Sequence, residues 1–209
     1  LVKEPNYPQL FINSSFIKRD VFNFNFDSRL VNSEDALIVN KILLRKQKIG
    51  YVNKTQYLYR KRKSHSSLID TAIYKKGFFI DKLRYFFKEL IDYSLEFYPV
   101  ENSNKELFVM NSIGKSITDK NHLNIFNYVP RFIQYVLAYD LQWIVSVPSF
   151  EDLLNESEQK EFWELFMYVL TYIDDDIIIN HISMKDDFKR FLIAFKHIYN
   201  SYQIEDIRN

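Results

Sequence analysis

The sequence predicts a mostly helical fold with a small β portion, an α+β arrangement whose strands are confined to about the first sixty residues. Only 3 glycines and 5 prolines occur among 209 residues, which argues against a turn-rich all-β fold. Apolar residues recur at helical spacing after residue 70. Runs typical of strands occur only before that point.

The composition is that of a globular protein with an aromatic core. Hydrophobic residues make up 47% of the chain, and 19 Phe and 15 Tyr supply side chains that bury large areas. Cysteine is absent, which excludes disulfides and cysteine nucleophiles. No apolar run approaches the roughly 20 residues that span a bilayer, and the polar start lacks an initiator Met and a signal pattern. We therefore expect a soluble, cytoplasmic protein cut from a longer chain.

Extended segments are expected near the start of the chain. Residues 10–17 are predicted to form a short strand and turn, and residues 51–59 form a run of strand-favouring side chains. Residues 22–26 alternate apolar and polar side chains, as an extended edge segment does.

A helix is predicted between these segments. Ser33 has the position of an N-cap, Glu34 and Asp35 fall in the first turn, and an apolar stretch follows at 36–46. Acids in a first turn satisfy unpaired N–H groups and the positive end of the helix dipole, so this pair has a purely structural explanation. The alternative is a carboxylate base, which a helix N-terminus keeps ionised at neutral pH.

Helical patterns continue after residue 70. A long helix is predicted at 70–98, a short one at 106–117, and another between Pro130, a favoured first-turn residue, and Pro148. Residues 183–186 have capping-box spacing. Two more helices carry the stripes Phe162, Leu165, Phe166, Val169, Leu170 and Ile173, and Phe188, Phe191, Leu192, Phe195 and Ile198.

Charge is unevenly distributed, although the net charge is only +1. Residues 36–69 hold nine Lys or Arg and no acid, whereas the chain from Glu151 onward holds thirteen acids and six bases. The first half therefore offers a site for an anion. A domain boundary is predicted where mixed structure gives way to helices alone, which gives domains at 1–68 and 69–209.

A basic segment follows the predicted strand at 51–59. It includes Arg60 and Arg62, with small hydroxyl residues just after them. The segment is either a stretch of solvent-exposed charges or a binding site for a pyrophosphate, a group that arginine binds well. A nucleic-acid surface is disfavoured, because the rest of the chain is not basic and carries no nucleic-acid motif.

The remaining polar groups are expected to be structural. The acids at 174–176 are predicted to mark a helix boundary, because adjacent side chains on a helix do not converge on one ion. His122, His181 and His197 lack the spacing of metal ligands. Phosphate-loop, nucleophile-elbow and zinc-protease motifs are absent from the sequence, and the residues that would bind a metal stay unknown.

A series of short runs between residues 10 and 72 has a specific order: FIKR from Phe16, FD from Phe26, NSEDALIVNK from Asn32, IGYV from Ile49, YLYRKR from Tyr57 and SSLID from Ser66. This order resembles the second half of bacterial family 2 glycosyltransferases, the GT-A enzymes of capsule, teichoic acid and lipopolysaccharide synthesis. The helical remainder, including YIDDDIII from Tyr172, is similar to a helical extension found in this group. The resemblance thus implies a partial GT-A domain followed by a helical bundle.

The resemblance implies a catalytic role for the acidic pair. Asp35 would be the general base, taking the proton of an acceptor hydroxyl as its oxygen attacks the anomeric carbon of the donor sugar. The result would be a single displacement with inversion. Glu34 would help to hold the acceptor.

The resemblance also gives the basic segment a role. Arg60 and Arg62, with Ser66 and Ser67, would close over the diphosphate of the donor, where fixed cations stabilise the charge that develops on the leaving group. Some relatives place a metal-binding histidine before this segment, and His65 is the nearby candidate here.

The same resemblance implies a cofactor and partners. Mg or Mn is expected for the complete enzyme, bound by an Asp-x-Asp motif in an N-terminal nucleotide-binding half that this chain lacks. The chain by itself is therefore expected to be inactive. Its partners would be a nucleotide-sugar donor, a glycan or polyol-phosphate acceptor, and the missing half.

Two other functions are open on the sequence alone. One is a helical interaction or oligomerisation module without catalytic activity, because the aromatic helices offer ample apolar surface. The other is attachment of the basic segment to the anionic inner face of the membrane.

Overall fold

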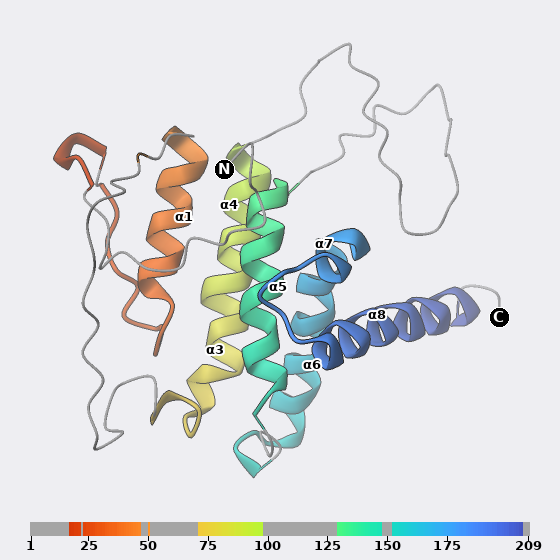
Figure 1. Cartoon of the computed structure of the whole chain (residues 1–209). Helices are drawn as coiled ribbons and strands as arrows, with labels where there is room; N and C mark the ends of the chain where they lie inside the picture. The colour runs from red at the N-terminus through yellow and green to blue at the C-terminus, as the bar shows by residue number, and fades with distance from the viewer. Residues whose placement is uncertain are drawn as a thin grey trace.

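The computed structural model describes residues 17–21, 23–46, 50, 71–97, 129–147 and 152–206. Every regular element in these ranges is a helix or a single helical turn, and none is a strand (Figure 1). The predicted α+β fold with a partial GT-A domain is therefore wrong for the described residues, which contain no sheet. The predicted strand at 51–59, and all of the one at 10–17 except Ile17, lie outside them.

The segment at 23–26, which follows the short turn η1 (Arg19–Val21), shows why an alternating pattern was misleading. The ring of Phe24 packs edge-on to that of Tyr93, with centroids 6.4 Å apart. The Arg45 guanidinium lies 5.7 Å from the Phe24 ring centroid. Phe24 is therefore apolar because it anchors an irregular segment on two helices, and no described strand pairs with it.

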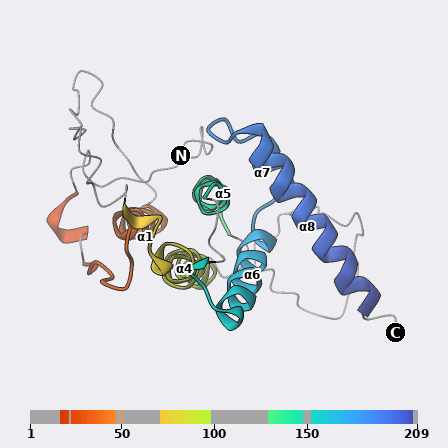
Figure 2. The same ribbon diagram turned by 90° about the horizontal axis from the view of Figure 1, so that it is seen from below.

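Helix α1 (Glu34–Lys46) begins directly after Ser33, two residues ahead of the predicted apolar stretch, so Glu34 and Asp35 lie in its first turn as predicted. It packs against helix α4 (Glu89–Phe97), and the two are neighbours in both views (Figures 1 and 2). Burial extends around most of α1, because its buried apolar residues are Ala36, Leu37, Ile38, Val39, Ile42, Leu43 and Leu44. The core beneath α1 therefore fixes the position of its first turn.

The central helix joins α3 (Ile80–Lys82), the π-helical segment η3 (Leu83–Lys88) and α4. A π segment inside a helix shifts the register of the side chains on either side of it. The helical spacing of apolar residues predicted after residue 70 is confirmed here, because Phe79, which directly precedes α3, and Leu83, Phe86 and Leu90 are completely buried.

The predicted start of this helix at residue 70 is wrong. Between α3 and the helical turn at 71–72, the chain passes through turns and the short segment η2 (Lys76–Phe78). A Cβ atom on Gly77 would lie 2.8 Å from Val31 and 2.9 Å from the Asp81 carboxylate. A side chain at residue 77 would therefore require Val31 and Asp81 to shift, and α3 begins three residues after this contact.

The second half of the chain forms helices α5 (Arg131–Val145), α6 (Glu156–Thr171), α7 (Asp175–Ile179) and α8 (Asp186–Asp206). Helix α5 lies in the middle of the molecule, with α1 and α4 on one side and α6 to α8 on the other (Figure 2). The predicted helices after Pro130 and around the Phe162 stripe are confirmed. The predicted helix at 106–117 lies outside the described residues.

The capping box was assigned to the wrong helix. At the start of α6, the Asn155 side chain accepts from the Glu158 amide and the Glu158 side chain accepts from the Asn155 amide. Residues 183–186 do not form the predicted box, because α8 begins only at Asp186 and the Ser183 amide donates to His181 Nδ1 instead.

One hydrophobic core connects these helices, from Leu30 beside α1 to Leu192 of α8. Its largest members are phenylalanines of the central helix and of α6 that are at most 1% exposed: Phe79, Phe86, Phe87, Phe162 and Phe166. Each contributes about 1.5–3 kcal/mol by burial. The high aromatic content of the sequence is therefore used in the packing of α6 against the central helix.

Candidate functional site

The Glu34–Asp35 pair lies in the first turn of α1, at the border between core and surface. Both residues are half-buried, and Ala36 directly after them is only 3% exposed. Asp35 Oδ1 accepts a hydrogen bond of 2.8 Å from the Ala36 amide. This bond uses one of the N–H groups that a helix start leaves unpaired, and it fixes the carboxylate of Asp35.

Two acceptor atoms on residues shortly before Asp35 in the chain are buried and have no donor among the described residues. Glu34 Oε2 and Asn32 Oδ1 are shielded from solvent and have no hydrogen-bond partner in the described part of the chain. A buried acceptor without a partner is unfavourable by about 1–3 kcal/mol, and by more when it is charged. A hydroxyl or amide donor that reached Glu34 Oε2 would relieve this penalty.

Ser33 connects the acidic pair to the interior of the protein. Its φ angle is 72°, a left-handed conformation that is unfavourable by about 1–2 kcal/mol for a residue with a side chain. Its hydroxyl donates to Asp140 Oδ2 on α5 across 3.3 Å. Ser33 thus precedes α1 as predicted, but its φ angle is not that of an ordinary N-cap and its hydroxyl bonds to another helix.

Asp140 also belongs to a buried ion pair. Lys82 Nζ on α3 lies 3.0 Å from Asp140 Oδ2, and the two residues are only 2% and 7% exposed. The Lys82 ammonium lies 5.2 Å from the ring centroid of Phe78 and 6.0 Å from that of Phe86. Such a pair is tolerated because each charge neutralises the other, whereas either charge alone would be strongly unfavourable.

Sequence reasoning missed Lys82 and Asp140. Lys82 falls between Phe78 and Phe86, four residues from each, and all three are buried. Asp140 is four residues after Val136 within the apolar stripe of α5. A single charged residue in each of two otherwise apolar helix faces was the available signal, since such residues are buried in pairs.

The predicted basic site cannot be placed beside the acidic pair. Arg60, Arg62, His65, Ser66 and Ser67 all lie outside the described residues. The proximity of Asp35 to this cationic segment therefore stays a prediction.

The acids at 174–176 mark a helix boundary, as the sequence predicted. Asp174 precedes α7, and Asp175 and Asp176 lie in its first turn. Asp174 and Asp176 pair with Arg131, whose nitrogens lie 4.0 Å and 2.6 Å from their Oδ2 atoms, whereas Asp175 Oδ1 lies 2.8 Å from Lys196 Nζ. The three carboxylates are therefore divided between two different cations.

Lys196 and His197 of α8 both contact Asp175 of α7. Burial raises the pKa of Asp175, but Lys196 at 2.8 Å and His197 at 2.7 Å more than compensate and hold this pKa below its usual range. Lys196, which is 3% exposed, also donates to the Ile173 carbonyl across 2.6 Å. Within the ranges that the structure describes, no three histidines or acids come together in a way that could hold a metal ion.

His181 is a satisfied core residue, as expected. Its Nε2 lies 3.0 Å from the carbonyl oxygen of Tyr135, and its Nδ1 accepts from the Ser183 amide across 3.3 Å. Burial lowers the pKa of His181. The neutral ring with a proton on Nε2 fits both contacts. His122 lies outside the described residues.

The fold and the candidate site together define a helical protein with an acidic pair at the start of a buried helix. Among the helices that are described, none combines the length and the apolar character needed to cross a membrane.

Comparison with known proteins finds relatives named for teichoic acid biosynthesis. The chain is 33% identical over 197 residues, 93% of its length, to the minor teichoic acid biosynthesis protein GgaB of Bacillus subtilis (strain 168). It is 26% identical over 174 residues, 80% of its length, to the minor teichoic acid biosynthesis protein GgaA of the same organism. The chain spans only 19% of GgaB and 32% of GgaA. No family model and no solved structure matches it.

Proposed function

We propose that this chain is part of a bacterial glycosyltransferase of teichoic acid synthesis, of the family 2 type, in which Asp35 is the general base. The enzyme transfers a sugar from a nucleotide-sugar donor to a teichoic-acid-type acceptor at the cytoplasmic face of the membrane. The similarity to GgaB along 93% of the chain supports the pathway. The order of short sequence runs around Glu34 and Asp35 supports the reaction type.

The observation that carries the proposal is the position of Asp35. Its carboxylate is half-buried on the first turn of a helix whose following residues are in the core, and the Ala36 amide orients it. A general base must be held rigidly yet reach its substrate, and this position meets both requirements.

The proposed step is a single displacement. The acceptor hydroxyl oxygen forms a bond to the anomeric carbon while the bond from that carbon to the donor diphosphate breaks, and the nucleoside diphosphate leaves with the electron pair. The hydroxyl proton passes to Asp35. Glu34, half-buried beside Asp35, helps to hold the acceptor and so positions it.

Mg or Mn would supply stabilisation of the diphosphate charge when it is bound. Neither the acidic pair nor the acids at the start of α7 offer a suitable set of ligands in the described residues. We therefore assign no metal ligand among the described residues, and we place Arg60 and Arg62 near the donor diphosphate as part of the same proposal.

The test uses the complete natural polypeptide that contains this chain. Nucleoside diphosphate release is measured from a panel of UDP-, GDP- and dTDP-sugars with poly(glycerol phosphate) as acceptor. Asp35→Asn is expected to lower kcat by about 10²–10⁴-fold, because the variant cannot take the proton. Asp20→Asn, at an exposed aspartate of η1, is the matched control. Unchanged turnover in Asp35→Asn, with an active parent enzyme, would refute the assignment.

A second function, self-association through α8, is supported by a different observation. Phe191 and Ile198 on this helix are 39% and 57% exposed, and Ala194 between them is exposed as well. The Phe191 ring stacks on that of Phe195, with centroids 5.7 Å apart, and Phe195 is partly buried against the core. The exposed apolar residues of α8 are therefore in contact with the core. Light scattering over a concentration series tests this: Ile198→Ser should lower the average mass of an oligomer, and a monomer at all concentrations would exclude it.

A further inference from the structure

A chain of buried polar contacts leads from the interior to the acidic pair. Lys82 Nζ contacts Asp140 Oδ2 at 3.0 Å, and the same oxygen accepts the hydroxyl of Ser33 at 3.3 Å. Ser33 is bonded directly to Glu34 in the chain. The three residues come from α3, α5 and the start of α1, so the path joins three elements at one point.

The backbone at Ser33 needs this support. Its φ angle of 72° is disfavoured for serine, and the conformation at this residue decides the direction in which the chain enters α1. The Ser33 carbonyl accepts the first helical hydrogen bond, from the Leu37 amide at 3.0 Å. A change in conformation at Ser33 would therefore move both acidic side chains relative to the core.

We propose that Asp140, paired with Lys82, is a positioning residue for the Glu34–Asp35 pair; this inference rests on the proposed function. Asp140 accepts the Ser33 hydroxyl, holds Ser33 in the left-handed conformation and so fixes where the Asp35 carboxylate lies. Lys82 holds the Asp140 carboxylate in place through the 3.0 Å ion pair. Neither residue touches the substrate, and both act through Ser33.

Two variants of Ser33 provide a matched test of this proposal. Ser33→Ala and Ser33→Gly both remove the hydroxyl, but glycine adopts a φ of 72° without a penalty whereas alanine does not. If the hydroxyl serves to hold the backbone, the glycine variant should retain function and the alanine variant should lose it. If the hydroxyl binds a substrate, both variants should lose function equally.

The first measurement is turnover of the complete polypeptide, with the same nucleotide-sugar panel and poly(glycerol phosphate). Ser33→Ala is expected to lower kcat by about tenfold with little change in KM, because a displaced base impairs the chemical step. Ser33→Gly is expected to stay within about threefold of the parent. Equal losses in both variants, or no loss in Ser33→Ala, would overturn the proposal.

The second measurement does not depend on activity. Hydrogen exchange of the Ala36 and Leu37 amides reports the first turn of α1 directly, and it should be about tenfold faster in Ser33→Ala and near the parent value in Ser33→Gly. Unchanged exchange in Ser33→Ala would overturn the positioning role even if Asp35 is catalytic. Normal turnover of Asp35→Asn with faster exchange in Ser33→Ala would instead refute the proposed function and leave the structural contact standing.

Discussion

Replacing Lys82 by methionine should destabilise the protein strongly, because it leaves the Asp140 carboxylate buried without its counter-ion. The side chains of Lys82 and Asp140 are 2% and 10% exposed, so solvent cannot replace the lost contact. Breaking such a pair costs about 3–5 kcal/mol. The Ser33 hydroxyl still donates to Asp140, which places the expected loss near the lower end, at about 3 kcal/mol.

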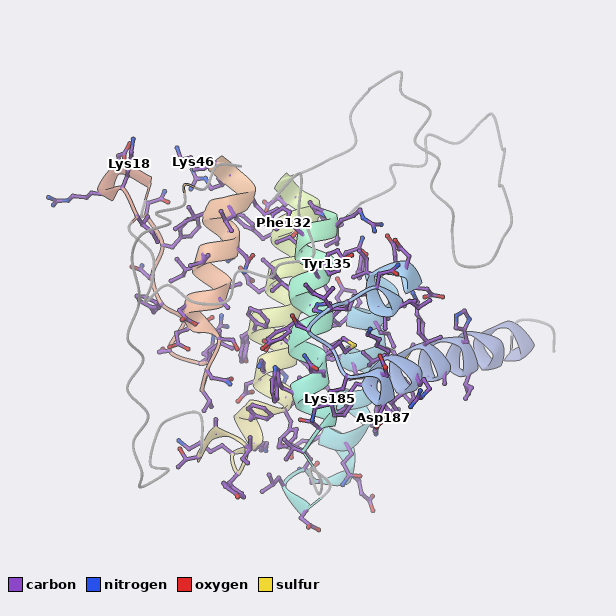
Figure 3. All side chains as sticks on the ribbon, viewed as in Figure 1. Lys18, Lys46, Phe132, Tyr135, Lys185 and Asp187 are labelled. Atoms are coloured by element: carbon purple, nitrogen blue, oxygen red, sulfur yellow. The ribbon has the colours of Figure 1, made fainter. Side chains whose placement is uncertain are left out.

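The measurement is urea unfolding followed by circular dichroism, with the slope of the transition checked for two-state behaviour. A loss of about 3 kcal/mol corresponds to a Tm lower by about 6–12 °C for a domain of this size. Lys185→Met is the matched control, since Lys185 is exposed at the start of α8 (Figure 3) and its replacement should change stability by less than about 0.5 kcal/mol.

A double variant separates the loss of the pair from the loss of one charge. Lys82→Met with Asp140→Leu removes both charges, and apolar replacement of a buried ion pair is often neutral. The double variant should therefore be more stable than Lys82→Met alone. A Lys82→Met protein within about 0.5 kcal/mol of the parent, or a double variant less stable than the single one, would refute the reasoning about this pair.

Two further predictions concern stability. Asn155→Ala should lower the free energy of unfolding in urea by about 1 kcal/mol, because it removes the N-cap of α6. Ser157→Ala, at an exposed position of the same turn, should have little effect, and equal effects of the two variants would contradict the capping role. Burial lowers the pKa of His181 below 6.5, so the unfolded chain binds its proton first, and this residue's contribution to stability should fall as pH drops from about 6.5 toward the folded pKa. His181→Gln should flatten this part of the pH dependence, and an unchanged slope would show that His181 does not cause it.

Local patterns predicted much of the helical structure. The stripes of the central helix and of α6 were identified from spacing alone, because helical periodicity depends only on neighbouring residues in the chain. The position of Glu34 and Asp35 at a helix start was predicted for the same reason. For the described residues the predicted fold class was wrong, because strand-like alternation, as at Phe24, also arises where an irregular segment packs on helices.

Only part of the candidate site could be predicted from local sequence patterns. The sequence identified the acidic pair, but nothing local linked Ser33 to Asp140, which lies 107 residues further along the chain. The start of the central helix was misplaced because the close approach of Val31 and Gly77 is likewise a contact between distant segments.

The sequence by itself determined the helices that carry apolar stripes, where many aromatic core residues fall and which acids begin α1. The tertiary structure alone decided that Lys82 and Asp140 meet and that Ser33 bonds to them in a left-handed conformation. The physical reason is that helix periodicity is set by residues a few positions apart, whereas the pairing of buried charges depends on which helices the packed core brings together.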